Sequence, residues 1–166
     1  MLSILFTILI TFFIASLFGY VVHKSLHQKW SGRLHKAHMT HHITLYPPED
    51  CVSDEYRDPG KDSTVKIFAA AAAPLVAIPF VLGLLHIMPW VLVIVSLIVM
   101  AVMSFLHGYL HDSFHIRNHW LSRLPVIGLW FSRLVQTHWL HHVDMQTNFG
   151  IFVFHWDHLL GTFWKE

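Results

Sequence analysis

Histidine is the residue whose number and spacing could do chemistry in this chain. The sequence holds 16 histidines among 166 residues, and ten of them form four short clusters. These clusters are His23 with His27; His38, His41 and His42; His107 with His111; and His138, His141 and His142. Two clusters have the pattern His-x-x-x-His and two have the pattern His-x-x-His-His.

This spacing favours metal binding. On a helix, side chains three or four residues apart share one face, with Cβ atoms about 5–6 Å apart, so two imidazoles can bind one ion. Imidazole suits iron, zinc, copper and nickel. Ten imidazoles are more than one ion can use, whereas two ions would have five each and keep a position open for a reactant. We therefore predict a site for two metal ions.

Further histidines and acids lie close to these clusters in the sequence. His115 continues the i+4 series from His107 and His111 and could be an additional ligand. Asp157 is a candidate to accept the second ring N–H of a ligand histidine and fix its tautomer. Asp112 and Asp144 are alternatives for that role. The other histidines near the clusters, which could be ligands, neighbours of ligands or surface residues, are His35, His119, His155 and His158.

The composition indicates a membrane protein. The chain is 54% hydrophobic and 13% charged, whereas soluble domains carry about 25% charged residues. The net charge of +1 and the lack of a basic tract argue against nucleic acid as a partner. The single cysteine, Cys51, excludes an internal disulfide and a zinc module built on cysteine.

Three apolar stretches predict membrane-spanning helices. Residues 1–22 contain no charge and reach roughly 33 Å as a helix, enough for a hydrocarbon core of about 30 Å. Residues 66–86 and 90–110 form the second and third predicted spans, with a tight turn at 86–89 and with two prolines that should kink the second span. The expected fold is an all-α membrane bundle of about three spans, in a single domain over 1–166.

The polar segments connect these spans. We expect the second histidine cluster to lie in the loop after the first span, and residues 49–62 to form an acidic, solvated loop. Residues 118–137 have the pattern of a helix lying at the membrane interface.

Three crossings would gather the charges on one side of the membrane. All eleven basic residues and fifteen of the sixteen histidines would lie on the side that holds residues 23–64 and 111–166. The excess of lysine and arginine makes that side cytoplasmic. His86 alone would lie on the other side, so we expect it to be no part of the metal site.

In these motifs the chain resembles the fatty acid hydroxylase superfamily, which includes sterol desaturases and carotenoid hydroxylases. The order of the four histidine clusters carries the resemblance. The most specific part is His138-Trp-Leu-His141-His142, followed by Asn148-Phe-Gly150 and the run from Trp156 to Thr162. The segment from His111 to Pro125 is similar to small bacterial carotenoid hydroxylases, whereas the ending favours the fatty acid and sterol branch.

The resemblance implies a membrane-embedded, non-haem di-iron oxygenase that attacks an unactivated C–H bond of a lipid with O2. By matching position it carries the ligand role to all ten clustered histidines. It implies two iron ions, which zinc could replace in a purified sample. The product would be an alcohol or, after desaturation, an alkene. No electron-transfer module is evident, so electrons would come from a separate ferredoxin or b-type cytochrome.

Two other functions are compatible with a histidine-rich membrane protein. A metal transporter would place ionisable ligands near the middle of its spans, and the three predicted spans have no His, Asp or Glu at their centres. A non-catalytic zinc protein would have a closed site of four ligands, usually rich in cysteine. Both patterns fit this chain less well than an oxygenase does.

Overall fold

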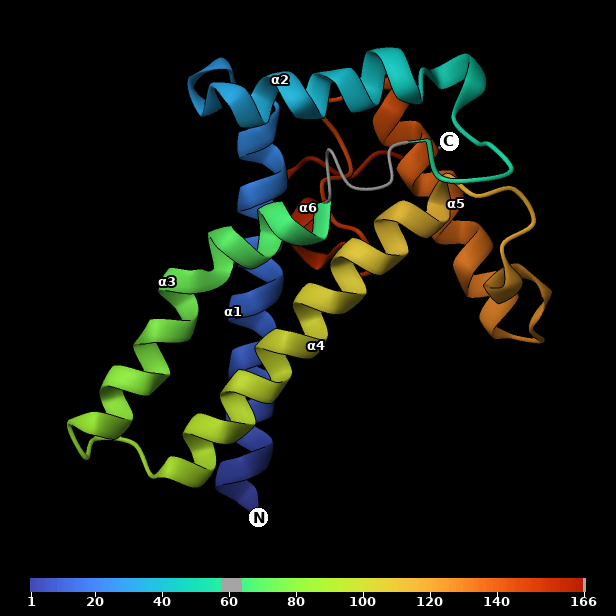
Figure 1. Ribbon diagram of the computed structural model, residues 1–166. Helices are drawn as coiled ribbons and strands as arrows, with labels where there is room; N and C mark the ends of the chain where they lie inside the picture. Colours follow the sequence, from blue (N-terminus) through green and yellow to red (C-terminus); the bar gives the residue numbers. More distant parts are fainter. Residues whose placement is uncertain (58–63, 166) are drawn as a thin grey trace.

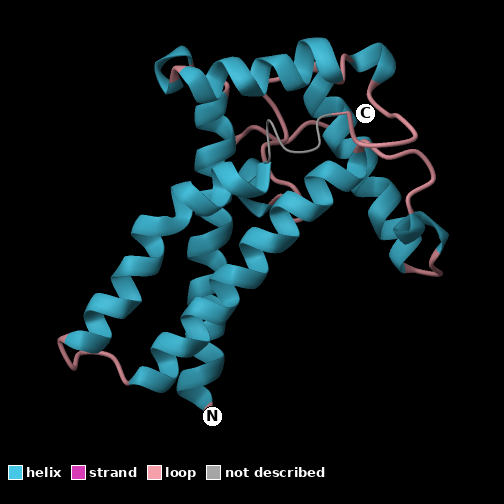
Figure 2. Cartoon of the chain, viewed as in Figure 1, coloured by secondary structure: helices cyan, strands magenta, loops and turns pink. Residues whose placement is uncertain are grey.

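The computed structural model describes residues 1–57 and 64–165, with the side chains of 64–71 left aside. The part it describes is helical and has no strand, which confirms the predicted all-α class. Figure 1 and Figure 2 show the helices. The α-helices are α1 (Leu2–Leu26), α2 (Arg33–Thr40), α3 (Thr64–Leu84), α4 (Trp90–Phe114), α5 (Ile127–Val143) and α6 (His155–Leu160). The shorter turns are η1 (Lys29–Ser31), η2 (His41–Leu45), η3 (Pro48–Asp50) and η4 (Trp120–Arg123).

The long helices α1, α3 and α4 form the stem of the molecule. The N-terminus and the turn between α3 and α4 lie at its lower end in Figure 1, and the other connections lie at the opposite end. Of the described residues, α1 and α4 are long and apolar enough to cross a membrane, and Ala72–Leu84 of α3 is a shorter apolar stretch. That the end of the stem with the histidine clusters faces the cytoplasm stays a prediction.

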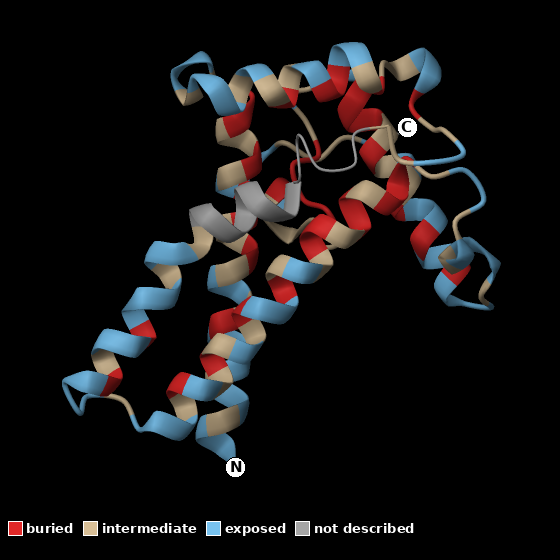
Figure 3. Cartoon of the chain, viewed as in Figure 1, coloured by how far each residue is buried: buried red, intermediate tan, exposed pale blue. Residues whose placement is uncertain are grey.

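The surface of the stem is apolar. Its exposed side chains include Phe6 on α1, Ile78 on α3 and Ile98 on α4, and exposed residues follow one another along the lower stem in Figure 3. Exposure of so much hydrocarbon is unfavourable in water and favourable in the apolar core of a bilayer. The exposed residues therefore support insertion of the stem into a membrane.

The second histidine cluster lies on a helix, contrary to the expected loop. Gly32, with a φ of 59°, precedes α2, and the helix continues into the wider π-helical turn η2. Pro47 follows η2, and proline cannot continue a helix. His38 thus belongs to α2, while His41 and His42 belong to η2. Isolated π-helical turns occur often at functional sites. The loop predicted at 49–62 lies outside the described residues from 58 onwards.

The helix predicted at 118–137 is also displaced along the chain. Residues 120–123 form the short turn η4, and Pro125 separates it from α5, which begins at Ile127. Because α5 extends to Val143, it carries the last histidine cluster on one regular helix, as its spacing predicts. Leu134 and Phe131 of α5 pack with Leu110 and Phe114 of α4 in an apolar core. This packing holds α5 against the upper end of α4.

Candidate metal centre

The upper end of the stem holds a buried cluster of imidazoles. Potential ligand atoms of five histidines lie within 4.8 Å of one another, and those of four more form a second such set. The first group comprises His23, His27, His38, His42 and His141. The second group comprises His41, His115, His138 and His142. Both groups draw on residues from the first and last thirds of the chain, so the fold assembles what the sequence separates.

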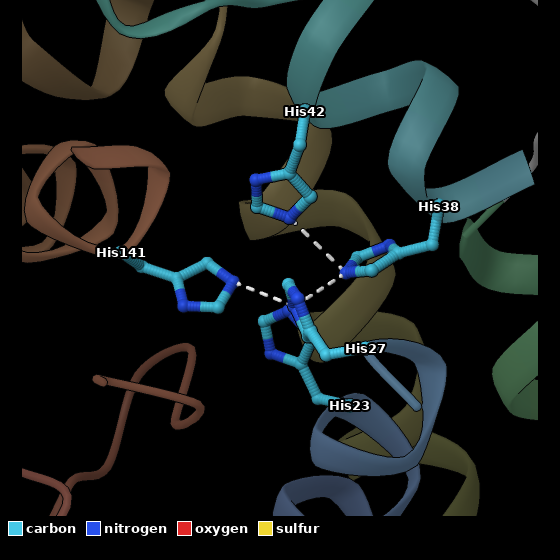
Figure 4. Close-up of side chains that lie close together, drawn as sticks. All are labelled: His23, His27, His38, His42 and His141. Carbon is cyan, nitrogen blue, oxygen red and sulfur yellow. Dashed lines mark hydrogen bonds between the residues drawn. The ribbon is translucent and has the colours of Figure 1, made fainter. Parts of the chain in front are cut away.

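The first group surrounds a common centre. Figure 4 shows the five rings turned toward one another from α1, α2, η2 and α5. The Nε2 atom of His27 lies 2.9 Å from that of His38 and 3.1 Å from that of His141. The Nε2 atoms of His38 and His42 are 3.1 Å apart. In the second group, the Nε2 atoms of His115 and His138 are also 3.1 Å apart.

These distances fit ligands that share an ion. Nitrogen atoms bound at about 2.1 Å, as in zinc sites, and at right angles to one another would be about 3.0 Å apart. The Nε2 atoms of His23, His41 and His142 are buried without a hydrogen-bond partner among the described residues. A buried polar atom without a partner is unfavourable unless something binds it. Metal ions in both groups would satisfy this requirement.

Backbone carbonyl groups orient four of these rings. The Nδ1 atoms of His23 and His142 lie 2.7 Å from the carbonyl oxygens of Phe149 and Tyr46, respectively. The Nδ1 atom of His115 lies 2.8 Å from the carbonyl oxygen of Cys51, and that of His141 lies 2.5 Å from the one of Thr147. A carbonyl oxygen only accepts, so each Nδ1 carries the proton and each Nε2 presents its lone pair. This is the tautomer that a metal ligand needs.

Burial keeps the rings neutral. It lowers the pKa of His27 to about 4, with help from the nearby His35. Burial also lowers the pKa of His142 to about 3, although the carbonyl of Tyr46 raises it. The pKa values of His38 and His138 lie well below their ordinary range, first because of burial and then because neighbouring imidazoles repel a second positive charge. Neutral imidazole is the form that binds metal.

Asp157 supports the site through the backbone, and among the described residues its carboxylate hydrogen-bonds to none of the clustered rings. Its carboxylate is fully buried and accepts hydrogen bonds from the N–H groups of Phe149 and Gly150 and from the hydroxyl of Thr162. The carbonyl of Phe149 in turn accepts from His23. Burial raises the pKa of Asp157, and these three donors oppose the rise. In place of the predicted direct bond to a ring N–H, Asp157 holds the turn that orients His23.

The other two candidate acids, Asp112 and Asp144, have different surroundings. Asp112 Oδ1 lies 3.3 Å from the Nδ1 atom of His111, as a carboxylate that orients an imidazole would. Asp144 is exposed and accepts from the N–H of Gln146. It lies at the end of α5, where it shapes the turn after the helix.

The third histidine cluster, His107 with His111, is placed differently from the other three. His115, the additional candidate, lies in the second group, whereas His107 and His111 lie in neither group. The ring of His111 is close to the second group, with its centroid 4.8 Å from those of His41 and His138. The ring of His107 is 6.4 Å from that of His23. Ligand roles for both residues stay predictions.

The remaining histidines have other surroundings. His35 bonds the carbonyl of Leu26 through Nδ1 at 2.9 Å, and His119 caps η4. His155 lies 3.2 Å from the hydroxyl of Ser16, and His158 stacks on Phe163. His86 is exposed in the turn after α3, at the end of the stem opposite the cluster. Its predicted separation from the cluster agrees with this placement.

Two aromatic residues complete the centre: Tyr46, which the sequence analysis did not name, and Phe149, which lies in the Asn148-Phe-Gly150 motif. Tyr46 is fully buried and stacks on His115 with ring centroids 4.0 Å apart. Phe149 is also fully buried and packs its ring against those of His27 and His141. The only sequence signal for Tyr46 was its position four residues after His42. Both rings exclude water from the imidazoles, and both residues supply an orienting carbonyl.

Comparisons with known proteins agree with this arrangement. The family described as fatty acid hydroxylase matches residues 8–162, nearly the whole chain. Searches of curated proteins and of solved structures gave no match. The family match spans all four histidine clusters and the turn held by Asp157. The chain therefore belongs to the fatty acid hydroxylase family.

Proposed function

We propose that this protein is a membrane-bound, non-haem di-iron hydroxylase that uses O2 to oxidise a C–H bond of a lipid. The observation that carries the proposal is the pair of adjacent, buried imidazole groups, with nitrogen spacings that suit shared ions. Family membership and apolar helices long enough for a membrane support the same reading.

We assign one ion to the first group and the other to the second group together with His111. Each ion would then have five imidazoles, because His111 lies beside His41 and His138. In this assignment His115 takes the place that the sequence gave to His107. An all-nitrogen, all-neutral ligand set suits iron, although zinc and copper also bind imidazole.

The bound iron ions would supply O2 activation. Hydroxylation consumes one C–H bond, one O2, two electrons and two protons, and it yields one alcohol and one water. The chain's own residues bury the centre and fix the ring orientations, which keeps bulk water away from the reacting carbon. We propose that a separate ferredoxin or b-type cytochrome supplies the electrons and that the centre faces the cytoplasm.

The test combines metal analysis with a product search. Protein purified without added zinc should hold about two iron ions per chain, and it should consume O2 when a chemical reductant and a lipid extract are supplied. Mass spectrometry of lipids from cells with and without the protein should reveal a gain of one oxygen, or a loss of two hydrogens if the reaction is a desaturation. Iron-loaded protein that changes no lipid and consumes no O2 would sink the proposal.

A further inference from the structure

Large apolar side chains are exposed where α5 begins, at the end of that helix remote from the metal centre. We call this group the α5 tip; its members are Trp120, Val126, Ile127, Leu129 and Trp130. Val126 is 79% exposed and Leu129 is 71% exposed. The pattern of residues 118–137 predicted a helix at the membrane interface. The structure gathers the exposed large apolar side chains of that segment at the turn η4 and in the first turn of α5.

The exposed side of α5 changes from apolar to polar along the helix. The exposed residues, in order, are Ile127, Leu129, Trp130, Ser132, Arg133 and Gln136. Leu129 and Gln136 are seven residues apart, so they share one face and lie about 10 Å apart along the helix axis. A helix that leaves the apolar core of a bilayer and enters water has this pattern. The polar end is the end that carries the histidines of the metal centre.

The α5 tip is continuous with the apolar surface of the stem. Phe105 on α4 is exposed, and its ring stacks on that of Tyr109 with the ring centroids 5.7 Å apart. The hydroxyl of Tyr109 accepts a hydrogen bond from Nε1 of Trp120 at 2.9 Å. Tyrosine and tryptophan, with an apolar ring and one polar group, are enriched at membrane interfaces. These three rings connect the stem surface to the α5 tip.

The α5 tip lies beside the stem and not above it. In Figure 1, α5 runs downward from the histidine cluster, and its beginning is level with the middle of the stem. Figure 3 shows exposed residues at this lower end of α5. A bilayer that surrounds the stem would therefore also reach the tip.

We propose that the α5 tip enters the acyl-chain region of the leaflet around the upper end of the stem and holds α5 there. The partner of this surface is the lipid of that leaflet. Arg133, about one turn above Trp130, then lies among the headgroups, where its charge can meet phosphate. One end of α5 is held by lipid and the other by the metal centre. The proposal needs a stem in a membrane and does not depend on the hydroxylase function.

Fluorescence quenching of the full chain in lipid nanodiscs tests the insertion. Leu129→Cys and Gln136→Cys each receive one bimane label. Cys51 is buried, and burial raises its pKa to about 12, so its thiol should stay unlabelled, which the unsubstituted chain checks. Lipids with a nitroxide on the acyl chain should quench the label on Leu129→Cys, and iodide in the water should not. The label on Gln136→Cys should respond in the opposite way.

Ile98→Cys, on the exposed surface of α4, is the control for insertion of the stem. Its label should respond as that on Leu129→Cys does. Iodide quenching of the label on Leu129→Cys alone would overturn the proposal, and iodide quenching of both would also overturn insertion of the stem. Protection of Leu129→Cys from both quenchers would overturn it too, because protein would then cover the tip, as in a contact between two copies of the chain.

A charge at the tip gives a second test, because its effect has opposite signs in water and in lipid. Leu129 lies in the first turn of α5, where the helix dipole makes a carboxylate favourable in water. In hydrocarbon the same carboxylate is unfavourable. Leu129→Asp should therefore lower the midpoint of thermal unfolding in nanodiscs, as followed by circular dichroism. Leu129→Met keeps an apolar side chain of similar size and should match the wild type. An unchanged or raised midpoint for Leu129→Asp would contradict contact with lipid.

Discussion

At the scale of single residues, the function depends on where each imidazole nitrogen points. His141 is the clearest case, because its Nδ1 atom faces the carbonyl of Thr147 and its Nε2 atom faces His27. His141→Ala removes a ligand and leaves a cavity in the first group. We expect it to lower metal content and to abolish turnover, measured by metal analysis and by lipid mass spectrometry. His86→Ala, in the remote exposed turn, should match the wild type; equal activity in both variants would refute the ligand assignment.

Asp157 gives a second prediction at this scale. Its two carboxylate oxygens accept three hydrogen bonds inside the protein. Asp157→Asn replaces one acceptor oxygen with an NH2 group that faces N–H or O–H donors. We expect the free energy of unfolding to fall by about 1–3 kcal/mol, as measured by denaturation in detergent. The exposed Asp144 provides a control, because Asp144→Asn retains an acceptor for the N–H of Gln146. Similar losses in both variants would count against a special role for Asp157.

At the scale of elements, the turn after α5 holds the metal centre against α1. Asn148 has a φ of 53° and exchanges two hydrogen bonds with the backbone of Trp164, and the next residue bonds His23 through its carbonyl. Gly150 lies so close to the chain that an added Cβ atom would be 2.3 Å from the carbonyl oxygen of Val153. Close approach of the backbone, and not a positive φ, is thus the reason for glycine here.

Gly150→Ala should therefore displace the turn. We expect a lower midpoint of thermal unfolding and weaker metal retention, because the carbonyl of Phe149 would lose its position against His23. Both can be measured by heating the purified protein and analysing the metal released. Gly161→Asn is a suitable comparison: Gly161 has a φ of 70°, open space around its Cβ position, and a conformation that asparagine tolerates. A Gly150→Ala protein as stable as the Gly161→Asn protein would show that the turn accommodates the added methyl group, and it would contradict this prediction.

The sequence predicted the long helices and the histidine clusters because both depend on local spacing. It could not choose among the histidines at the end of α4, since His107, His111 and the next residue in the series, His115, follow at intervals of four and would share one face of a helix. In the structure α4 ends at Phe114, and the Nε2 atom of His115 lies 3.1 Å from that of His138. The role of Asp157 in holding the turn could not be predicted from local spacing either, because two of its partners are backbone N–H groups that any residue could supply. The π-helical turn at His41 and His42 left no recognisable signal.

At the scale of the whole molecule, the buried imidazoles link stability to pH. In the unfolded chain a histidine has a pKa of about 6.5, whereas His27 and His142 in the fold have pKa values of about 4 and about 3. Above about pH 6.5 neither state takes up protons at these rings, so stability does not change through them. Between about pH 6.5 and pH 4 the unfolded state binds protons that the folded state does not, and the free energy of unfolding falls as the pH falls.

We therefore expect the metal-free protein in detergent to unfold at one constant temperature from about pH 8 to pH 7, and at progressively lower temperatures from about pH 6.5 to pH 4. Thermal unfolding followed by circular dichroism at each pH would measure this. His27→Gln should give a shallower decline, because one fewer buried imidazole distinguishes the two states. The metal-loaded protein should decline in the same direction and more steeply, since protons compete with the ions for the same nitrogens. An unfolding temperature that stays constant or rises down to about pH 5 would contradict neutral burial of the cluster.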